Sequence, residues 1–205
     1  DRSPSRGLGD VYKRQGYNMR ITDLLDKRSI SLDAAPVDKK ATLDMAVELM
    51  AKSGKLMDVE QYRAQVYARE EESTTGIGEG IAIPHGKCDA VKTPGLAAMV
   101  IKNGVDYDSL DGEPVTLLFL IAAPNTKDNV HLDVLSKLSV MLMDENFTTS
   151  LRNAKSVEEF LQIIDAADES AKSIDDRLSD TGITTEEKKS FKLLAVTSCC
   201  LLYTS

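Results

Sequence analysis

The sequence predicts an α/β protein in which helices flank a mixed β-sheet. Two observations carry this prediction. Along residues 19–167, patterns with the period of a helix alternate with short apolar runs of strand length. Turn residues bound these runs, as is typical of strands. With 205 residues, 42% of them hydrophobic and 28% charged, the chain has the composition of one globular domain with additional segments.

The first part of this body is expected to supply a strand and two long helices. Residues 19–34 (MRITDLLDKRSISLDA) predict a short helix followed by a strand. Asp38 is expected to cap a helix that stops at Gly54. A second helix is expected over residues 59–69, with Tyr62, Val66 and Tyr67 facing inward. The inner face of the Asp38 helix is marked by apolar residues at helical spacing, which are Leu43, Ala46, Val47 and Met50.

Three apolar runs then predict the central strands. Isoleucines at 77, 81 and 83 alternate with small residues, as in a strand that lies close to other backbone. Residues 96–101 and 115–122 read as two buried strands. The connection NGVDYDSLDGEP (103–114) holds turn signals and one short strand.

Two amphipathic helices are expected to close the body. Asn129 is expected to cap the first, and the second is expected to span Ser156–Ala167. Ser156 and Glu159 form the pattern of a capping box at its start. The inner face of the first helix is expected to carry Val134, Leu135, Leu138, Met141 and Leu142.

The ends of the chain are expected to lie outside the folded body. Residues 1–18 lack an apolar period and read as a non-native or disordered leader, so Met19 is the expected native start. Residues 168–190 are polar and acidic, which predicts a solvated linker. Residues 191–199 (FKLLAVTSC) predict a new buried strand, and residues 200–205 read as a non-native end.

Bulk composition excludes several classes of function. A net charge of −8 argues against nucleic-acid binding and against an anionic membrane surface. The longest apolar run, residues 115–123, is far shorter than the roughly 20 residues of a membrane helix. Three cysteines, at 88, 199 and 200, cannot form a disulfide framework, which favours a reducing cytoplasm.

The stretch GIGEGIAIPHGK at residues 76–87 contains His85, one of two histidines in the chain. Pro84 fixes the backbone before His85, and Gly86 allows another molecule to approach closely. A neutral imidazole is a competent nucleophile near pH 7, because its ordinary pKa is about 6.5. The stretch therefore predicts a strand that ends in a fixed bend and presents a histidine.

Other interpretations, including purely structural ones, fit the same residues. A histidine on an apolar strand is more often structural than catalytic. Gly76, Gly78 and Gly80 are compatible with a tight hairpin, and the Gly-Lys-Ser/Thr ending of a phosphate-binding Walker motif is absent. His85 and Cys88 have the spacing of zinc ligands, but no second pair accompanies them. Cys88 as a thiol nucleophile would need a base and an orienting partner.

Two further residues could join His85. His131 is expected in the first turn of a helix, where backbone N–H groups favour anions. Arg69 ends the helix before the glycine-rich stretch, although three following glutamates also suit a surface ion pair. Phosphoryl transfer asks mainly for positioning and positive charge around the oxygens. Two imidazoles and a guanidinium would meet this demand if they converged.

Residues 19–167 closely resemble the IIA domain of the bacterial phosphoenolpyruvate-dependent sugar phosphotransferase system (PTS), fructose/mannitol type. The segment AREEESTTGIGEGIAIPHGKCDAV (68–91) carries the specific part, TGIG-x-GIAIPH. The second matching block is NVHLDVLSKLSVML (129–142), with the second histidine. The segments from Met19 to Ala34 and from Asp38 onward resemble the N-terminus of the family.

The resemblance implies a site and its partners. It implies that the histidine-containing phosphocarrier protein phosphorylates Nε2 of His85, that His131 orients or stabilises the phosphoryl group, and that Arg69 contacts the phosphate oxygens. The group would pass to a cysteine of a IIB domain and then to a sugar, fructose above others, during uptake through the membrane domain IIC. No metal or organic cofactor is implied.

The resemblance also offers an interpretation of the C-terminal end. FKLLAVTSC is similar to the opening of a fructose-type IIB domain, with Cys199 at the acceptor position. The family continues with a Pro-Thr-Gly loop, whereas this chain reads Cys200-Leu201-Leu202. The chain is thus expected to be a fragment of a longer permease. A regulatory, nitrogen-type IIA protein that signals through protein contacts is the alternative.

Overall fold

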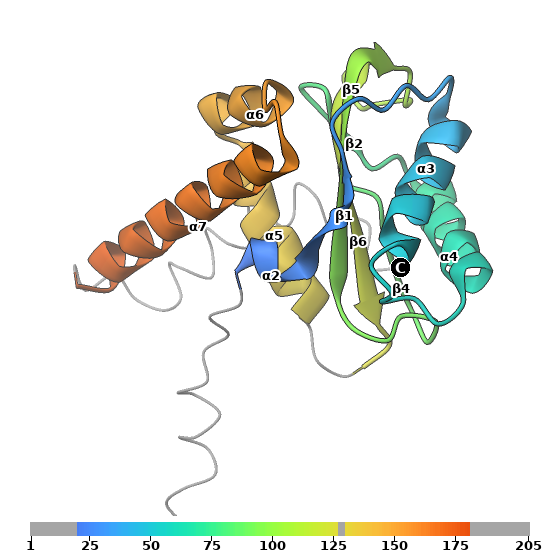
Figure 1. The fold of residues 1–205 in the computed structure, drawn as a ribbon, viewed down its shortest axis with the longest axis horizontal. Coiled ribbons are helices and arrows are strands. Elements are labelled where there is room, and N and C mark those ends of the chain that lie inside the picture. The colour runs from blue at the N-terminus through green and yellow to red at the C-terminus, as the bar shows by residue number, and fades with distance from the viewer. Residues whose placement is uncertain (1–19, 127–129, 181–205) are drawn as a thin grey trace, which may run out of the picture.

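The computed structural model describes residues 20–126 and 130–180, with the backbone alone for 130–133 and 171–180. A mixed sheet forms the middle layer, and helices cover both of its faces (Figure 1). Helices α3 and α4 lie on one face, and α2, α5, α6 and α7 lie on the other. The helices are α2 (Ile21–Leu24), α3 (Lys39–Ala51), α4 (Val59–Glu72), α5 (Val130–Leu142), α6 (Glu145–Arg152) and α7 (Val157–Asp180).

The described sheet has the strand order β1-β5-β6-β3-β2, and β4 pairs with the same edge of β6 as β3. Strands β5 and β6 are antiparallel, whereas β1 runs parallel to β5, and β3 and β4 run parallel to β6. The sheet is therefore mixed, as predicted. The strands are β1 (Leu25–Ser31), β2 (Gly76–Gly78), β3 (Ile81–Ala82), β4 (His85–Cys88), β5 (Gly95–Val105) and β6 (Val115–Pro124).

Alternation along the central strands builds two cores. Along β6, Leu117, Phe119 and Ile121 face the α5 side, and Leu118, Leu120 and Ala122 face α3 and α4. Strands β5 and β6 bury most of their side chains on both faces. Their sequences are therefore continuous apolar runs rather than alternating patterns.

The predicted helices of the N-terminal half are confirmed, with one change in the inner face. Asp38 caps α3, since its Oδ1 accepts a hydrogen bond of 2.7 Å from the amide of Ala41. The four predicted inner residues of α3 are all buried. In α4, Tyr62 and Val66 are buried as predicted, but Tyr67 is only half-buried because its hydroxyl donates to Asp44 on α3.

The glycine-rich stretch differs from the single strand that was predicted. It forms the hairpin β2–β3, and a further strand, β4, begins at His85. The connection at 103–114 holds no separate strand, because β5 itself continues to Val105. Helix α6 was not predicted at all, since its eight residues show only a brief apolar period in Phe147 and Leu151.

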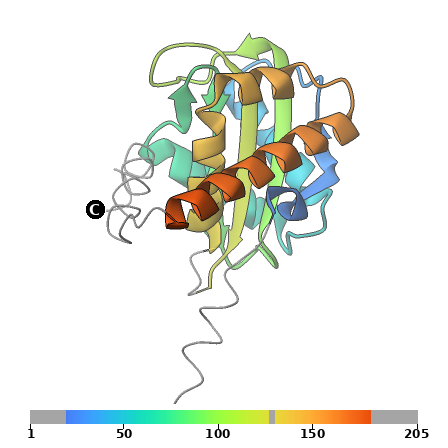
Figure 2. The ribbon, with the colours of Figure 1, turned by 90° about the vertical axis from the view of Figure 1, so that its left-hand side faces the viewer.

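The predicted C-terminal end of the last helix is wrong. Helix α7 continues through Ala167 to Asp180, and Figure 2 shows it crossing the sheet diagonally. Ser156 caps it as predicted, accepting a bond of 3.1 Å from the amide of Glu159. Asp168, placed by the sequence in a solvated linker, is fully buried. It accepts a bond of 3.0 Å from the amide of Ile21 and pairs with Lys137.

The expected leader, the second half of the expected linker and the expected strand at 191–199 lie outside the described residues, so those domain boundaries stay predictions. The expected cap at Asn129 also lies outside them. All five predicted inner residues of α5 are buried. Of the helices in the described ranges, none combines the length and apolar character that crossing a membrane requires.

Candidate functional site

His85 opens β4 near the C-terminal end of β6. It lies in register with Ile121 of β6, and the amide of Ile121 donates a bond of 3.0 Å to the carbonyl of Pro84. Neighbours in register point to the same face of a sheet, and Ile121 belongs to the core on the α5 side. His85 is therefore directed toward the layer that contains α5, and its side chain is only partly exposed.

The hydrogen bond of the imidazole defines its tautomer. Nδ1 of His85 lies 3.0 Å from the carbonyl oxygen of Ile83. A carbonyl can only accept, so Nδ1 carries the hydrogen and donates it. In the neutral ring, Nε2 then holds the lone pair. The backbone of the same short segment thus orients the ring and leaves the nucleophilic nitrogen at its far side.

The surroundings keep this ring uncharged. Burial lowers the pKa of His85 from its ordinary 6.5, and the positive charge of Arg69 lowers it further. The bond to Ile83 and the carboxylates of Glu70 and Glu72 act in the opposite direction but do not outweigh burial. A neutral His85 near pH 7 has the protonation state that a nucleophile needs.

Helix α4 packs directly against β4 at Gly86, where a side chain would have no room. A Cβ at Gly86 would lie 3.0 Å from the ring of Tyr62 and 3.2 Å from a methyl of Val66. The Tyr62 hydroxyl donates a bond of 2.8 Å to the carbonyl of Ile121. This contact joins α4 to the strand that flanks His85 and fixes the helix relative to the ring.

Arg69 lies in the last turn of α4 and is only 6% exposed. Its Nη1 donates to the carbonyl and to the hydroxyl of Ser73, at 3.2 and 3.3 Å. The positive charge of Arg69 is one of the influences that lower the pKa of His85. A role of Arg69 at the imidazole stays a prediction.

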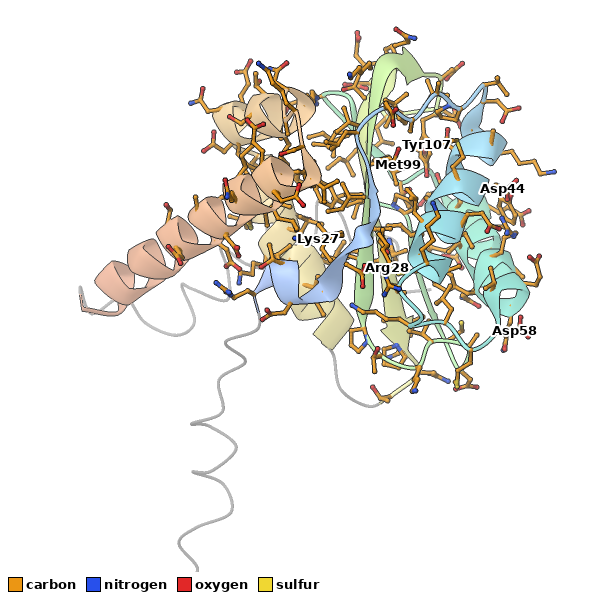
Figure 3. All side chains as sticks on the ribbon, in the orientation of Figure 1. Lys27, Arg28, Asp44, Asp58, Met99 and Tyr107 are labelled. Atoms are coloured by element: carbon orange, nitrogen blue, oxygen red, sulfur yellow. The ribbon has the colours of Figure 1, made fainter. Side chains whose placement is uncertain are left out.

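Beside Arg69, the buried carboxylate of Glu70 holds the end of α4 in place. Its Oε1 accepts from the amide of Thr75 at 2.9 Å and pairs with Nζ of Lys39 at 3.0 Å. Its Oε2 accepts from the Thr75 hydroxyl at 2.6 Å and from the Tyr107 hydroxyl at 3.3 Å. Tyr107 lies on the α3 side of the sheet (Figure 3). Four donors satisfy a carboxylate that would otherwise be costly to bury.

This network reaches His85 through the backbone. The carbonyl of Thr75 accepts a bond of 3.0 Å from the amide of Ile83, and the carbonyl of Ile83 accepts from His85. Glu70 therefore positions both Arg69, its neighbour on the helix, and the segment that orients the imidazole. Glu70 was not predicted from the sequence, because a glutamate in a run of four charged residues is typical of a solvated face.

The glycines form a tight turn rather than a cradle at His85. Gly78, Glu79 and Gly80 all have positive φ, at 107°, 55° and 74°. The carboxylate of Asp111 accepts a bond of 2.8 Å from the amide of Glu79, which supports this strained turn. The turn lies beside the start of β6, whereas His85 lies beside Ile121, so the hairpin interpretation is confirmed.

His131 occupies the first turn of α5, which belongs to the layer toward which His85 is directed. Its side chain lies outside the described part of the structure, so its role stays a prediction. Cys88 is buried, and burial raises the pKa of its thiol, the reverse of what a thiolate nucleophile requires. Among the described residues, no group of three or more potential ligands could hold a metal ion.

The lowered pKa of His85 gives a pH prediction. The unfolded ring titrates near 6.5, so the unfolded chain binds more protons than the folded one between that value and the lower folded pKa. The free energy of unfolding should therefore fall as the pH drops through this window. An NMR titration of the ring nitrogens should show hydrogen on Nδ1 and a midpoint below 6.5. A midpoint at or above 6.5, or hydrogen on Nε2, would contradict the assignment.

The folded part of the chain is similar to known proteins. Residues 23–167 match the family described as "Phosphoenolpyruvate-dependent sugar phosphotransferase system, EIIA 2". The PTS system fructose-specific EIIABC component of Bacillus subtilis (strain 168) is 44% identical over 150 residues, which are 73% of this chain and 24% of that protein. The chain thus spans about a quarter of the length of this curated relative.

Solved structures of other proteins share this fold. The nitrogen regulatory protein IIA-Ntr of Neisseria meningitidis is 32% identical, with a TM-score of 0.66 over 70% of this chain and 98% of that one. In a complex of enzyme IIA-Mtl with phosphorylated enzyme IIB-Mtl from Escherichia coli, the matching chain is 27% identical, with a TM-score of 0.61 over 70% and 99%.

The predicted resemblance to IIA domains is thereby confirmed, whereas the expected start of a IIB domain at 191–199 stays a prediction. The match covers the two histidines, Arg69 and every described strand. The chain belongs to the EIIA 2 family of the phosphoenolpyruvate-dependent sugar phosphotransferase system.

Proposed function

We propose that this chain is a phosphocarrier whose His85 accepts a phosphoryl group at Nε2 and passes it on. The observation that carries the proposal is the bond from Nδ1 of His85 to the carbonyl of Ile83, which leaves Nε2 with the lone pair. A lowered pKa keeps that nitrogen unprotonated at neutral pH. Covalent transfer through a residue of this kind divides one phosphoryl transfer into two steps.

The proposed transfer has two steps, each of which breaks one bond to phosphorus and forms another. In the first, the N–P bond of a donor phosphohistidine breaks and a bond forms between phosphorus and Nε2 of His85, while Nδ1 keeps its hydrogen. The ring then carries a positive charge beside the phosphoryl dianion. In the second, the N–P bond breaks, its electron pair returns to Nε2, and a cysteine thiolate of the acceptor forms an S–P bond.

Arg69 and His131 are proposed to act on the phosphoryl oxygens. Arg69 is held at the end of α4 by Ser73 and by the neighbouring Glu70 network. Its side chain therefore loses little conformational entropy when its planar donors bind an anion. His131 lies in a first helical turn, where backbone dipoles also favour negative charge. His131 would thereby stabilise or orient the phosphoryl group on His85.

The proposed partners follow from the relatives. The histidine-containing phosphocarrier protein is the proposed donor, and a IIB cysteine is the proposed acceptor. The IIA–IIB complex of the mannitol system supports a IIB partner, and the fructose-specific EIIABC relative supports fructose as the transported sugar. In a full permease of that type, the chain would work on the cytoplasmic side beside the membrane domain IIC.

The similarity to the nitrogen regulatory protein IIA-Ntr favours a second candidate. In that case the phosphorylation state of His85 would control contacts with other proteins, and no group would pass to a transporter. Both candidates use the same first step. They differ in whether a IIB domain accepts the phosphoryl group from His85.

A two-step transfer assay separates the candidates. The chain is phosphorylated with phosphoenolpyruvate and the upstream carriers, purified, and mixed with a fructose-type IIB domain and fructose. A sugar carrier should lose its label to the cysteine within seconds to minutes, and His131→Ala should slow this donation more than the acceptance. Label that stays on the chain would favour the regulatory role, and equal loss of both steps in His131→Ala would contradict an orienting role.

A further inference from the structure

A cleft of about 930 Å³ lies at the other end of the sheet from His85. It is bordered by the end of β1, the end of α3, the middle of β5, the start of β6 and the connection from α6 to α7. Neither His85 nor Arg69 lines it. Thr116 lies on its wall and precedes Ile121 by five residues on β6, which corresponds to roughly 17 Å along a strand.

A partly buried arginine on its wall is held rigidly. Nη2 of Arg152 donates to the carbonyl of Glu79 at 2.7 Å, and Nε donates to the Thr116 hydroxyl at 2.9 Å. Nη1 makes a longer bond of 3.4 Å to the hydroxyl of Thr148. All three acceptors are neutral oxygens. The guanidinium is thus fixed in direction while its charge is not matched by a bonded carboxylate.

The absence of a counterion extends to the other cations of the cleft. Lys52, Lys102 and Lys155 also line it, and no ion pair joins any of these four cations to a carboxylate within the described ranges. Asp33 is the acidic residue on the wall. A cluster of cations without matching carboxylates attracts an anion, more so in a chain of net charge −8.

Burial of the arginine adds to this attraction. Desolvation lowers the pKa of Arg152 from its ordinary value, while the more distant carboxylate of Glu79 acts in the other direction. A cation that loses hydration without gaining an anionic partner binds a negatively charged ligand more strongly than a fully solvated one does.

The remaining residues of the cleft wall indicate which chemical group the anionic ligand carries besides its negative charge. Leu32 and Val157, which are partly exposed, contribute apolar surface beside the cations. A volume of about 930 Å³ is at the upper end of the range for small-molecule sites and far exceeds the space that one inorganic anion fills. Guanidinium and ammonium groups next to apolar surface suit a phosphate dianion that carries an organic group.

We propose that this cleft binds a phosphomonoester of a small organic molecule, with the phosphate between Arg152, Lys102 and Lys155 and the organic group on the apolar wall. This site is separate from the phosphoryl-transfer site and does not depend on the function proposed for His85. Arg152 also holds Glu79, which belongs to the turn that leads through β3 to His85, so the ligand would bind beside a segment connected to the transfer site.

The test is a binding titration by NMR of the whole chain with phenyl phosphate and inorganic phosphate, at constant ionic strength. Phenyl phosphate should give saturable shifts in the amides of residues 100–102 and 152–157, and should bind more tightly than inorganic phosphate. Lys102→Ala/Lys155→Ala should weaken binding by about tenfold or more, because each variant position loses a charged donor. Both lysines are exposed, so this variant is expected to fold.

The matched control is Lys40→Ala/Lys92→Ala, which removes two exposed lysines outside the cleft and changes the net charge equally. It should leave the affinity within about twofold. Equal weakening by both pairs, shifts confined to residues 85–88, equal affinity for the two probes, or no saturation with phenyl phosphate would each overturn the proposal.

Discussion

A His85→Gln variant is expected to take up no measurable phosphoryl group from the upstream carrier. Glutamine keeps a side chain of similar length and polarity but has no nucleophilic nitrogen. Because the transfer passes through a covalent bond to Nε2, its rate should fall by at least about a thousandfold rather than by a modest factor. The measurement is the time course of labelling with phosphoenolpyruvate and purified carrier proteins.

His131→Gln is the matched control, since it removes the other imidazole of the chain. It should still be labelled, more slowly, at one site. Circular dichroism should show native secondary structure for both variants, because His85 is only partly buried and lies at the start of a strand. Full labelling of His85→Gln would show that the proposed acceptor is wrong.

Asp168→Ala is expected to destabilise the fold by about 3 kcal/mol, the second large effect. Asp168 is fully buried, and one oxygen accepts from the amide of Ile21 while the other pairs with Lys137. Removing the carboxylate leaves a partly buried ammonium and a buried amide without this partner. Urea denaturation followed by far-ultraviolet circular dichroism measures the loss.

Asp165→Ala provides the comparison from the preceding turn of α7. Asp165 also bonds the N-terminal segment, at 2.6 Å to the Thr22 hydroxyl, but its side chain is 35% exposed. Its loss should cost less than about 1 kcal/mol. Equal effects of the two substitutions would contradict the role given to the buried pair.

The sequence predicted elements whose signals are local. Asp38 followed by apolar residues at helical spacing defines the start and inner face of α3, and both are observed. The apolar runs of β5 and β6 define central strands because each buries both of its faces. Helix α6 and strand β4 were missed, since each is too short to show a period.

Features that depend on distant contacts could not be predicted in this way. Asp168 reads as part of an acidic linker, and only its contacts with Lys137 and Ile21, far away in the sequence, make it a core residue. The same holds for Glu70, whose partners Lys39 and Tyr107 come from other elements. A side chain's burial is decided by the fold rather than by its neighbours in the chain.

Part of the candidate site could be predicted because one short segment contains its chemistry. The Pro-His-Gly sequence fixes the backbone before His85 and leaves space after it, and the positive charge of Arg69 on α4 lowers the pKa of that ring. The tautomer could not be predicted, since it depends on the carbonyl of Ile83 turning back toward the ring. Nor could the cleft around Arg152, which five separate segments form.

Locating the phosphoryl group on the phosphorylated chain tests the central claim most directly. After incubation with phosphoenolpyruvate and the upstream carriers, ³¹P and ¹⁵N NMR of the labelled protein identifies the nitrogen bonded to phosphorus. We predict one phosphoryl group, on Nε2 of His85, with Nδ1 still carrying its hydrogen. Phosphorus on Nδ1, on His131 or on a cysteine would contradict the account.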